Sequence, residues 1–139
     1  MGLITRTNFG LVKKVQIPNA QVLTLPSTPV QLLPGPPAGQ FWCPDVMICW
    51  LNPAIAPYGN IDGAVAWRLS ICTFAIGSSF LPTTVLSGDT IVGGNVFFDH
   101  QPSPLPVTLI CTNGALGNFT GGDVANVLNV ELWYGQINV

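Results

Sequence analysis

Three observations predict that this chain folds as an all-β protein. Apolar and polar residues alternate over short segments, most regularly from Leu128 to Tyr134, which is the periodicity of a half-buried strand. The chain holds 15 glycines and 13 prolines among 139 residues, and both residue types favour turns. Prolines and β-branched residues interrupt the windows that are long enough for a helix. We therefore expect about eight to ten short strands packed as a two-sheet β-sandwich of the jelly-roll type.

The chain begins with a segment, residues 1–17, that we expect to be an extended N-terminal arm. It contains Arg6, Lys13 and Lys14, three of the four basic residues in the protein. Such a segment is either a frayed terminus, which is common, or an arm that contacts a neighbouring molecule. The length suits one hydrophobic core and no linker divides the remainder, so residues 18–139 are expected to form a single β-domain.

A proline-rich corner follows the first strand candidates. The pattern is extended from Ala20 onward, and the strand candidate Val30–Leu33 stops at residues 34–37, which read Pro-Gly-Pro-Pro and cannot donate ladder hydrogen bonds through their prolines. The next segment, residues 41–51, is apolar on both faces instead of alternating. A strand of this kind is covered on both sides, by its own domain or by a neighbouring chain.

The remaining strand candidates are short alternating or apolar segments: 65–71, 85–86, 91–92, 96–98, 107–112 and 128–134. Asn113 and Gly114 form the dipeptide that most strongly indicates a tight hairpin turn. Gly135 predicts a β-bulge, after which Ile137 and Val139 would change face.

Charged residues make up only 7% of the chain, against roughly 25% in typical domains. Residues 15–44, 69–88 and 100–122 contain none of them. A freely soluble monomer usually covers its surface with mixed charge, so we infer that much of this surface contacts other protein, with a homo-oligomer as one expected form. The alternative is a monomer whose surface is neutral and polar.

Charge and hydropathy also exclude two kinds of partner. A net charge of -2 without clusters of Lys and Arg does not fit a direct nucleic-acid partner. The longest uninterrupted apolar run, Val46–Leu51, is far shorter than the ~20 residues of a membrane helix, so no membrane association is expected. The first residues lack the features of an export signal, and synthesis in the cytoplasm is expected.

The sequence contains no recognisable catalytic or metal-binding constellation. Its four cysteines have no C-x-x-C spacing, and we expect them to be reduced and buried. Asp62, Asp89 and Asp123 adjoin glycines, where turns explain them better than catalysis does. His100, the only histidine, lies beside Asp99 and could act as the base for a cysteine nucleophile. No cysteine lies in a recognisable nucleophile motif, which counts against this role. We expect no enzyme activity, no metal and no cofactor.

The tryptophans are the candidate binding residues. Trp67 shares its strand face with apolar residues and is expected in the core. Trp133 projects from the polar face of its strand, while Trp42 and Trp50 belong to the segment that is apolar on both faces. We interpret these three as interface anchors, because a tryptophan buries up to about 250 Å² on contact. Stacking on sugar rings is the competing use of an exposed aromatic side chain.

Two segments of the chain show a resemblance to a known family. Residues 25–41, LPSTPVQLLPGPPAGQF, and residues 121–134, GGDVANVLNVELWY, resemble small β-rich structural proteins of tailed bacteriophages, in which a threonine-proline strand runs into a proline-glycine corner and a Gly-Asp turn leads the final strand. The size is similar to that of the cement or decoration proteins of phage capsids. The resemblance covers about thirty residues near the two ends of the chain.

This resemblance implies a non-enzymatic virion protein on the capsid exterior, made in the bacterial host cytoplasm. Its partner would be the major capsid protein, and it would hold adjacent subunits together against internal DNA pressure, as a homo-oligomer with a dimer favoured. The interface residues expected from the sequence are Trp42, Trp50, Trp133, Arg6, Lys13 and Lys14. The rival hypothesis is a tail-associated module that binds a receptor or a glycan, and an enzyme on the same fold is a third.

Overall fold

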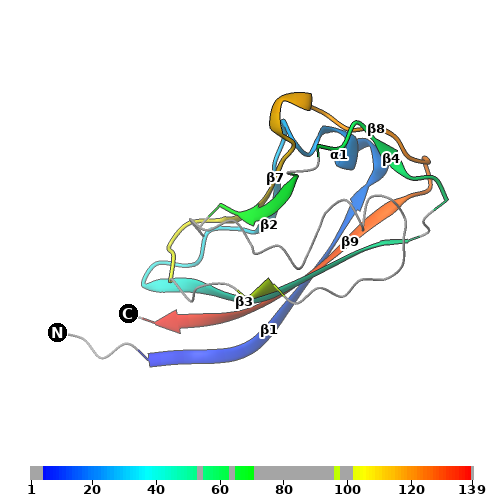
Figure 1. Ribbon diagram of the computed structural model, residues 1–139. Helices are drawn as coiled ribbons and strands as arrows, with labels where there is room; N and C mark the ends of the chain where they lie inside the picture. Colours follow the sequence, from blue (N-terminus) through cyan, green and yellow to red (C-terminus); the bar gives the residue numbers. More distant parts are fainter. Residues whose placement is uncertain (1–4, 53–54, 63–64, 71–95, 98–101, 139) are drawn as a thin grey trace.

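The computed structural model describes residues 5–52, 55–62, 65–70, 96–97 and 102–138 (Figure 1). The described chain is mostly β-strand with one short α-helix, which confirms the predicted all-β class. The elements are β1 (Thr5–Pro18), α1 (Asn19–Thr24), β2 (Val30–Leu33), β3 (Gln40–Asn52), β4 (Tyr58–Gly59), β5 (Ala66–Leu69), β6 (Val96–Phe97), β7 (Val107–Thr112), the 3-10 helix η1 (Gly114–Leu116), β8 (Thr120–Gly121) and β9 (Val127–Asn138).

The described strands form three antiparallel sheets. The largest has the order β1-β9-β3-β6, and its three long strands cross the length of the molecule with β9 between β1 and β3 (Figure 1). The second sheet has the order β2-β7-β5, and the third is the small pair β4-β8. β9, the last strand along the described residues, therefore lies inside this sheet, where it pairs with β1, the first strand, on one side and with β3 on the other.

One cluster of buried side chains includes residues of both larger sheets. From the largest sheet it takes Ile17, Met47, Cys49, Leu51, Leu128, Val130 and Leu132, and from the second Leu32, Leu33, Leu69, Val107, Leu109 and Cys111. Complete burial of one Val or Leu side chain contributes about 1.5–3 kcal/mol. This cluster therefore supplies most of the driving force for folding, and it fixes which face of β9 points inward.

The segment predicted to be an N-terminal arm is, in its described part, a strand of its own chain's sheet. β1 pairs with β9 from Thr5 to Pro18, and Ile17 is completely buried. The alternation of Leu11, Val15 and Ile17 is hidden in the sequence because lysines occupy the two positions between Val12 and Val15. At the edge of a sheet lysines are tolerated, since their charged ends reach water.

The helix α1 was not predicted, because Val22, Leu23 and Leu25 suggested an extended segment. It is one short turn and a half bounded by Pro18 and Pro26. Val22 and Leu25, three residues apart, lie on one side of it and are fully buried, which explains why so short a helix is stable here.

The bulge predicted at Gly135 of β9 is absent, and the irregularities lie on the two neighbouring strands instead. β9 runs without an extra residue, whereas β3 has one, Asp45, between its pairs with β9, and β1 shifts register around Gly10, which has a positive φ of 70°. Ile137 is buried, but because β9 has no extra residue it stays in phase with Trp133, and the predicted change of face does not occur. The extra residue in β3 reverses the faces of that strand, and this decides where its two tryptophans lie.

The dipeptide Asn113-Gly114 does not make the predicted hairpin. β7 pairs with β2 and β5, and the chain continues from Gly114 into η1. Asn113 is buried and accepts a hydrogen bond from the backbone N–H of Asp62 at 2.8 Å, while its amide donates to the carbonyls of Asn60 at 2.8 Å and Gly117 at 2.6 Å. The asparagine thus fastens the loop after β4 to the end of β7.

Candidate functional site

The candidate functional surface is the face of the largest sheet that points away from the buried cluster, which we call the outer face. Residues directly opposite each other on neighbouring strands share a face, so the register defines it. It consists of three rows across β1, β9 and β3: Val12, Trp133 and Val46; Lys14, Glu131 and Ile48; Gln16, Asn129 and Trp50. The second face of β3, predicted to be covered, is thus half exposed among the described residues.

The first row is an apolar patch, formed by Val12, Val46 and Trp133. Val12 and Trp133 are 37% and 38% exposed, which is high for large apolar side chains in the middle of long strands. The indole N–H of Trp133 donates to Glu131 Oε1 at 3.0 Å, so its one polar atom is satisfied within the protein. What remains accessible of this side chain is apolar ring surface, as an interface anchor requires.

The second row carries the charges of the outer face. Lys14 Nζ lies 3.8 Å from Glu131 Oε2, and the lysine side chain is 74% exposed while the glutamate is 17% exposed. A pair of this length with an exposed lysine contributes little to stability. Its effect is to cancel the charge at the centre of the face.

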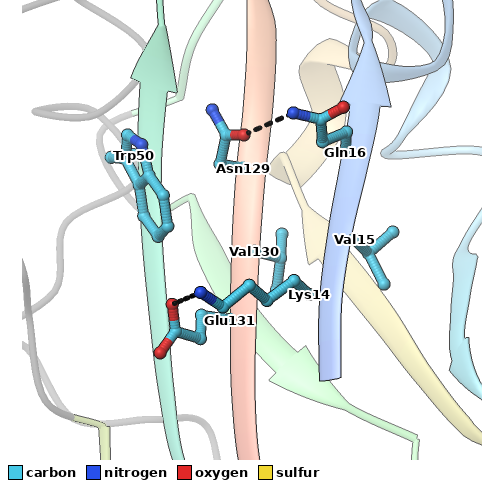
Figure 2. A pocket seen from close by; sticks show the side chains of 7 residues that line it. All are labelled: Lys14, Val15, Gln16, Trp50, Asn129, Val130 and Glu131. Atoms are coloured by element: carbon cyan, nitrogen blue, oxygen red, sulfur yellow. Dashed lines mark hydrogen bonds and ion pairs between the residues drawn. The ribbon is translucent and has the colours of Figure 1, made fainter. Parts of the chain in front are cut away.

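The third row forms a hollow of about 530 Å³ together with the second. Figure 2 shows Trp50 on β3 at one side, Gln16 and Lys14 on β1 at the other, and Asn129 and Glu131 on β9 between them. Gln16 Nε2 donates to Asn129 Oδ1 at 3.3 Å. The hollow therefore combines one aromatic side chain with amide, ammonium and carboxylate groups, and its volume lies in the range of small-molecule sites.

Trp42 is not on this face, which corrects its prediction as a surface anchor. It is only 9% exposed, its indole N–H donates to the carbonyl of Pro34 at 2.7 Å, and its ring packs edge to face on Tyr134 at 5.4 Å. The extra residue Asp45 places Trp42 on the opposite face from Trp50, although both have even numbers. Trp42 holds the proline-glycine corner against its own sheet.

The basic residues expected at an interface are spread along β1. Arg6 pairs with Ile137 in the register, and its side chain lies outside the described part. Lys13 lies opposite Leu132, on the other face from Lys14, and both lysines are exposed. Of the six predicted interface residues, the outer face therefore brings together Trp50, Trp133 and Lys14.

Sequence reasoning missed Gln16, Asn129 and Val12 as members of this surface. Nothing in its own segment marks any of the three as a binding residue. Only the pairing of β1 with β9 shows that they lie on one face of the sheet. The alternation in residues 128–134 did place Asn129 on the polar face with Trp133. The partner strand could not be identified in that way, because β1 was assigned to an arm.

The cysteines that the structure describes are buried and form no disulfide, as predicted: Cys43, Cys49 and Cys111. Burial raises the pKa of Cys49 well above its usual range, with a smaller contribution from Cys111, and burial raises the pKa of Cys111 to about 12. Cys72, Asp89, Asp99 and His100 lie outside the described residues. Within the described ranges, no cluster of three metal-ligating side chains occurs, and no helix is long and apolar enough to cross a membrane.

Comparisons with protein-family models, with curated proteins and with solved structures find no match to this chain.

Proposed function

We propose that this protein is a non-enzymatic cement protein of a tailed bacteriophage, which binds the outer capsid lattice and joins adjacent subunits of the major capsid protein. The observation that carries the proposal is the apolar patch of Val12, Val46 and Trp133 on a sheet face whose three described rows carry one pair of charges, Lys14 and Glu131. A patch of this kind favours contact with protein. The resemblance of residues 25–41 and 121–134 to phage structural proteins supplies the kind of partner.

The proposal includes a more specific fold. Because one buried cluster takes residues from both larger sheets, we propose that these sheets pack as a β-sandwich with the jelly-roll connections expected from the sequence. In that arrangement the outer face is the back of one sheet.

Cementing requires that one copy or one oligomer of the protein contact two capsid subunits at once. A capsid under internal pressure fails where subunits separate, and a dimer could grip two neighbours across a local two-fold axis. Two linked contacts bind with an avidity far above that of either one. The virion exterior is then the place of action, after synthesis in the host cytoplasm.

The binding should be largely apolar and therefore weakly dependent on salt. The accessible ring of Trp133 is the expected anchor, and Trp133→Ala is expected to weaken binding to capsids that lack the protein by about 2 kcal/mol or more, roughly thirtyfold. Val124→Ala is the matched control, because Val124 is an apolar residue that is 89% exposed outside the outer face. Cosedimentation with capsids at low and high salt measures both effects. Equal binding of the two variants, or loss of wild-type binding in moderate salt, would contradict the proposal.

A second candidate function is a tail-associated module that binds a receptor or a glycan. The hollow beside Trp50 favours it, because an aromatic side chain next to amide groups is suited to sugars. Assay of virion fractions with an antibody separates the two functions: a cement protein is found on heads, and a receptor-binding module is found on tails.

A further inference from the structure

The hollow on the outer face is set apart from the apolar patch by its chemistry. Trp50 provides an aromatic surface on β3, and the polar groups of Gln16 and Asn129 lie opposite it in the same row. Neighbouring strands are about 4.8 Å apart, so the backbones of β1 and β3 lie roughly 10 Å from each other across β9. The space above Asn129 is therefore bounded by an aromatic ring on one side and by an amide on the other (Figure 2).

The polar groups around the hollow are only loosely engaged with one another. The hydrogen bond from Gln16 to Asn129 is 3.3 Å long, and the Lys14 to Glu131 distance of 3.8 Å is beyond hydrogen-bonding range. Among the described residues, Gln16 Oε1 has no partner, and Lys14 Nζ has only the distant carboxylate. Each of these groups keeps capacity to donate to, or accept from, a ligand hydroxyl.

The charge of the lining selects the class of ligand. Lys14 and Glu131 are the charged groups of the lining, and they carry opposite signs. An anion or a cation would gain from one of them and be repelled by the other, whereas a neutral polyhydroxyl ligand can use both. A flat apolar ligand without hydroxyls would leave the amide and charged groups without partners, which is unfavourable.

We propose that this hollow is a binding subsite for a neutral hexopyranose ring of a glycan. The apolar C–H face of the ring stacks on the Trp50 indole, and its hydroxyls bond with Gln16, Asn129 and the ion pair of Lys14 and Glu131. This inference rests on the hollow alone and does not depend on the cement function, because the apolar patch that carries that function lies in a different row of the sheet.

Titration of the full-length protein with methyl pyranosides tests the subsite. The probes are the methyl glycosides of glucose, galactose and mannose, and the readout is the indole N–H and backbone amide signals in ¹H–¹⁵N NMR spectra. For a single sugar ring we expect a Kd on the order of 1–10 mM for at least one probe. The shifts should centre on the Trp50 indole and on the amide signals of Gln16 and Asn129.

Two variants and one control make the test decisive. Gln16→Ala, at an exposed position of the edge strand, should weaken binding at least fivefold without changing the fold, and Trp50→Ala should abolish it. Val12→Thr, on the same strand and face but outside the hollow, should bind as the wild type does. Shifts in no probe at about 50 mM, ten times the middle of the expected range, would overturn the proposal. Unchanged affinity of Gln16→Ala and Trp50→Ala would overturn it too, because the sugar would then bind elsewhere.

The subsite and the cement function can fail separately. Binding to capsids should survive Gln16→Ala, which touches only the hollow, and it should be weakened by Trp133→Ala. A protein that binds capsids but no pyranoside keeps the proposed function and loses this inference, and the reverse result keeps only the inference.

Discussion

The buried side chain of Asn113 gives the sharpest test of how the loops are held. Asn113 is 3% exposed and its three hydrogen bonds join the backbones of Asp62, Asn60 and Gly117, at 2.8, 2.8 and 2.6 Å. Replacement by alanine removes all three and leaves one N–H and two carbonyls without this partner. At about 1 kcal/mol for each group, Asn113→Ala should destabilise the protein by about 3 kcal/mol. For a domain of this size the melting temperature should fall by roughly 10 °C.

Urea unfolding followed by circular dichroism measures this loss, with thermal unfolding as a second probe. Asn118→Ala is the matched control, because Asn118 is exposed, takes part in the same loop through its backbone carbonyl, and keeps that carbonyl in the variant. We expect it to lie within about 0.5 kcal/mol of the wild type. A cost below 1 kcal/mol for Asn113→Ala, or equal costs for both variants, would refute the reasoning.

Two further predictions concern the backbone and the thiols. Gly114→Ala should destabilise the protein by more than about 1 kcal/mol in urea unfolding, because φ is 56° there and an added Cβ would lie 2.0 Å from Asp62 Oδ2; a variant as stable as the wild type would contradict this. Burial raises the pKa of Cys49 and Cys111 in the folded state above the value of 9.0 for an exposed thiol, so their contribution to stability is fully present below pH 9 and falls as pH rises above it. Unfolding free energy that stays constant between pH 8 and about pH 10 in wild type, with Cys111→Ser as comparison, would contradict the assignment.

The sequence predicted the elements whose pattern is local. The alternation around Leu128 and Leu132 identified both faces of β9, and Trp133 was placed on the exposed face because the residues that share its face, Asn129 and Glu131, are polar. The burial of Cys43, Cys49 and Cys111 as thiols outside any disulfide followed from the apolar segments around them. In these cases a few residues within one strand determine the outcome.

Features that depend on distant pairing were not predictable in this way. β1 was assigned to an arm because its lysines interrupt the apolar pattern, and only pairing with β9 shows that Ile17 enters the core. Trp42 was grouped with Trp50 because both belong to a segment that is apolar on both faces, and the extra residue at Asp45 places them on opposite faces of β3. The sequence does not reveal a bulge of this kind, because one polar residue such as Asp45 within an apolar segment does not by itself indicate an extra residue in the strand.

The candidate site was predictable to the same extent. Trp50, Trp133 and Lys14 were selected from the sequence, and the outer face contains all three. Gln16 and Asn129 complete the hollow only because their strands are neighbours in register. Side chains that act together across a sheet are invisible until the strand order is known.

The most direct test of the proposed cement function is the retention of DNA by phage particles under heat. Particles assembled without the protein are compared with the same particles after addition of the wild type, Trp133→Ala or Val124→Ala, and DNA release is followed with a fluorescent dye as temperature rises. The account predicts that the wild type and Val124→Ala raise the release temperature and that Trp133→Ala does so much less. Release at one temperature in all four samples would contradict it.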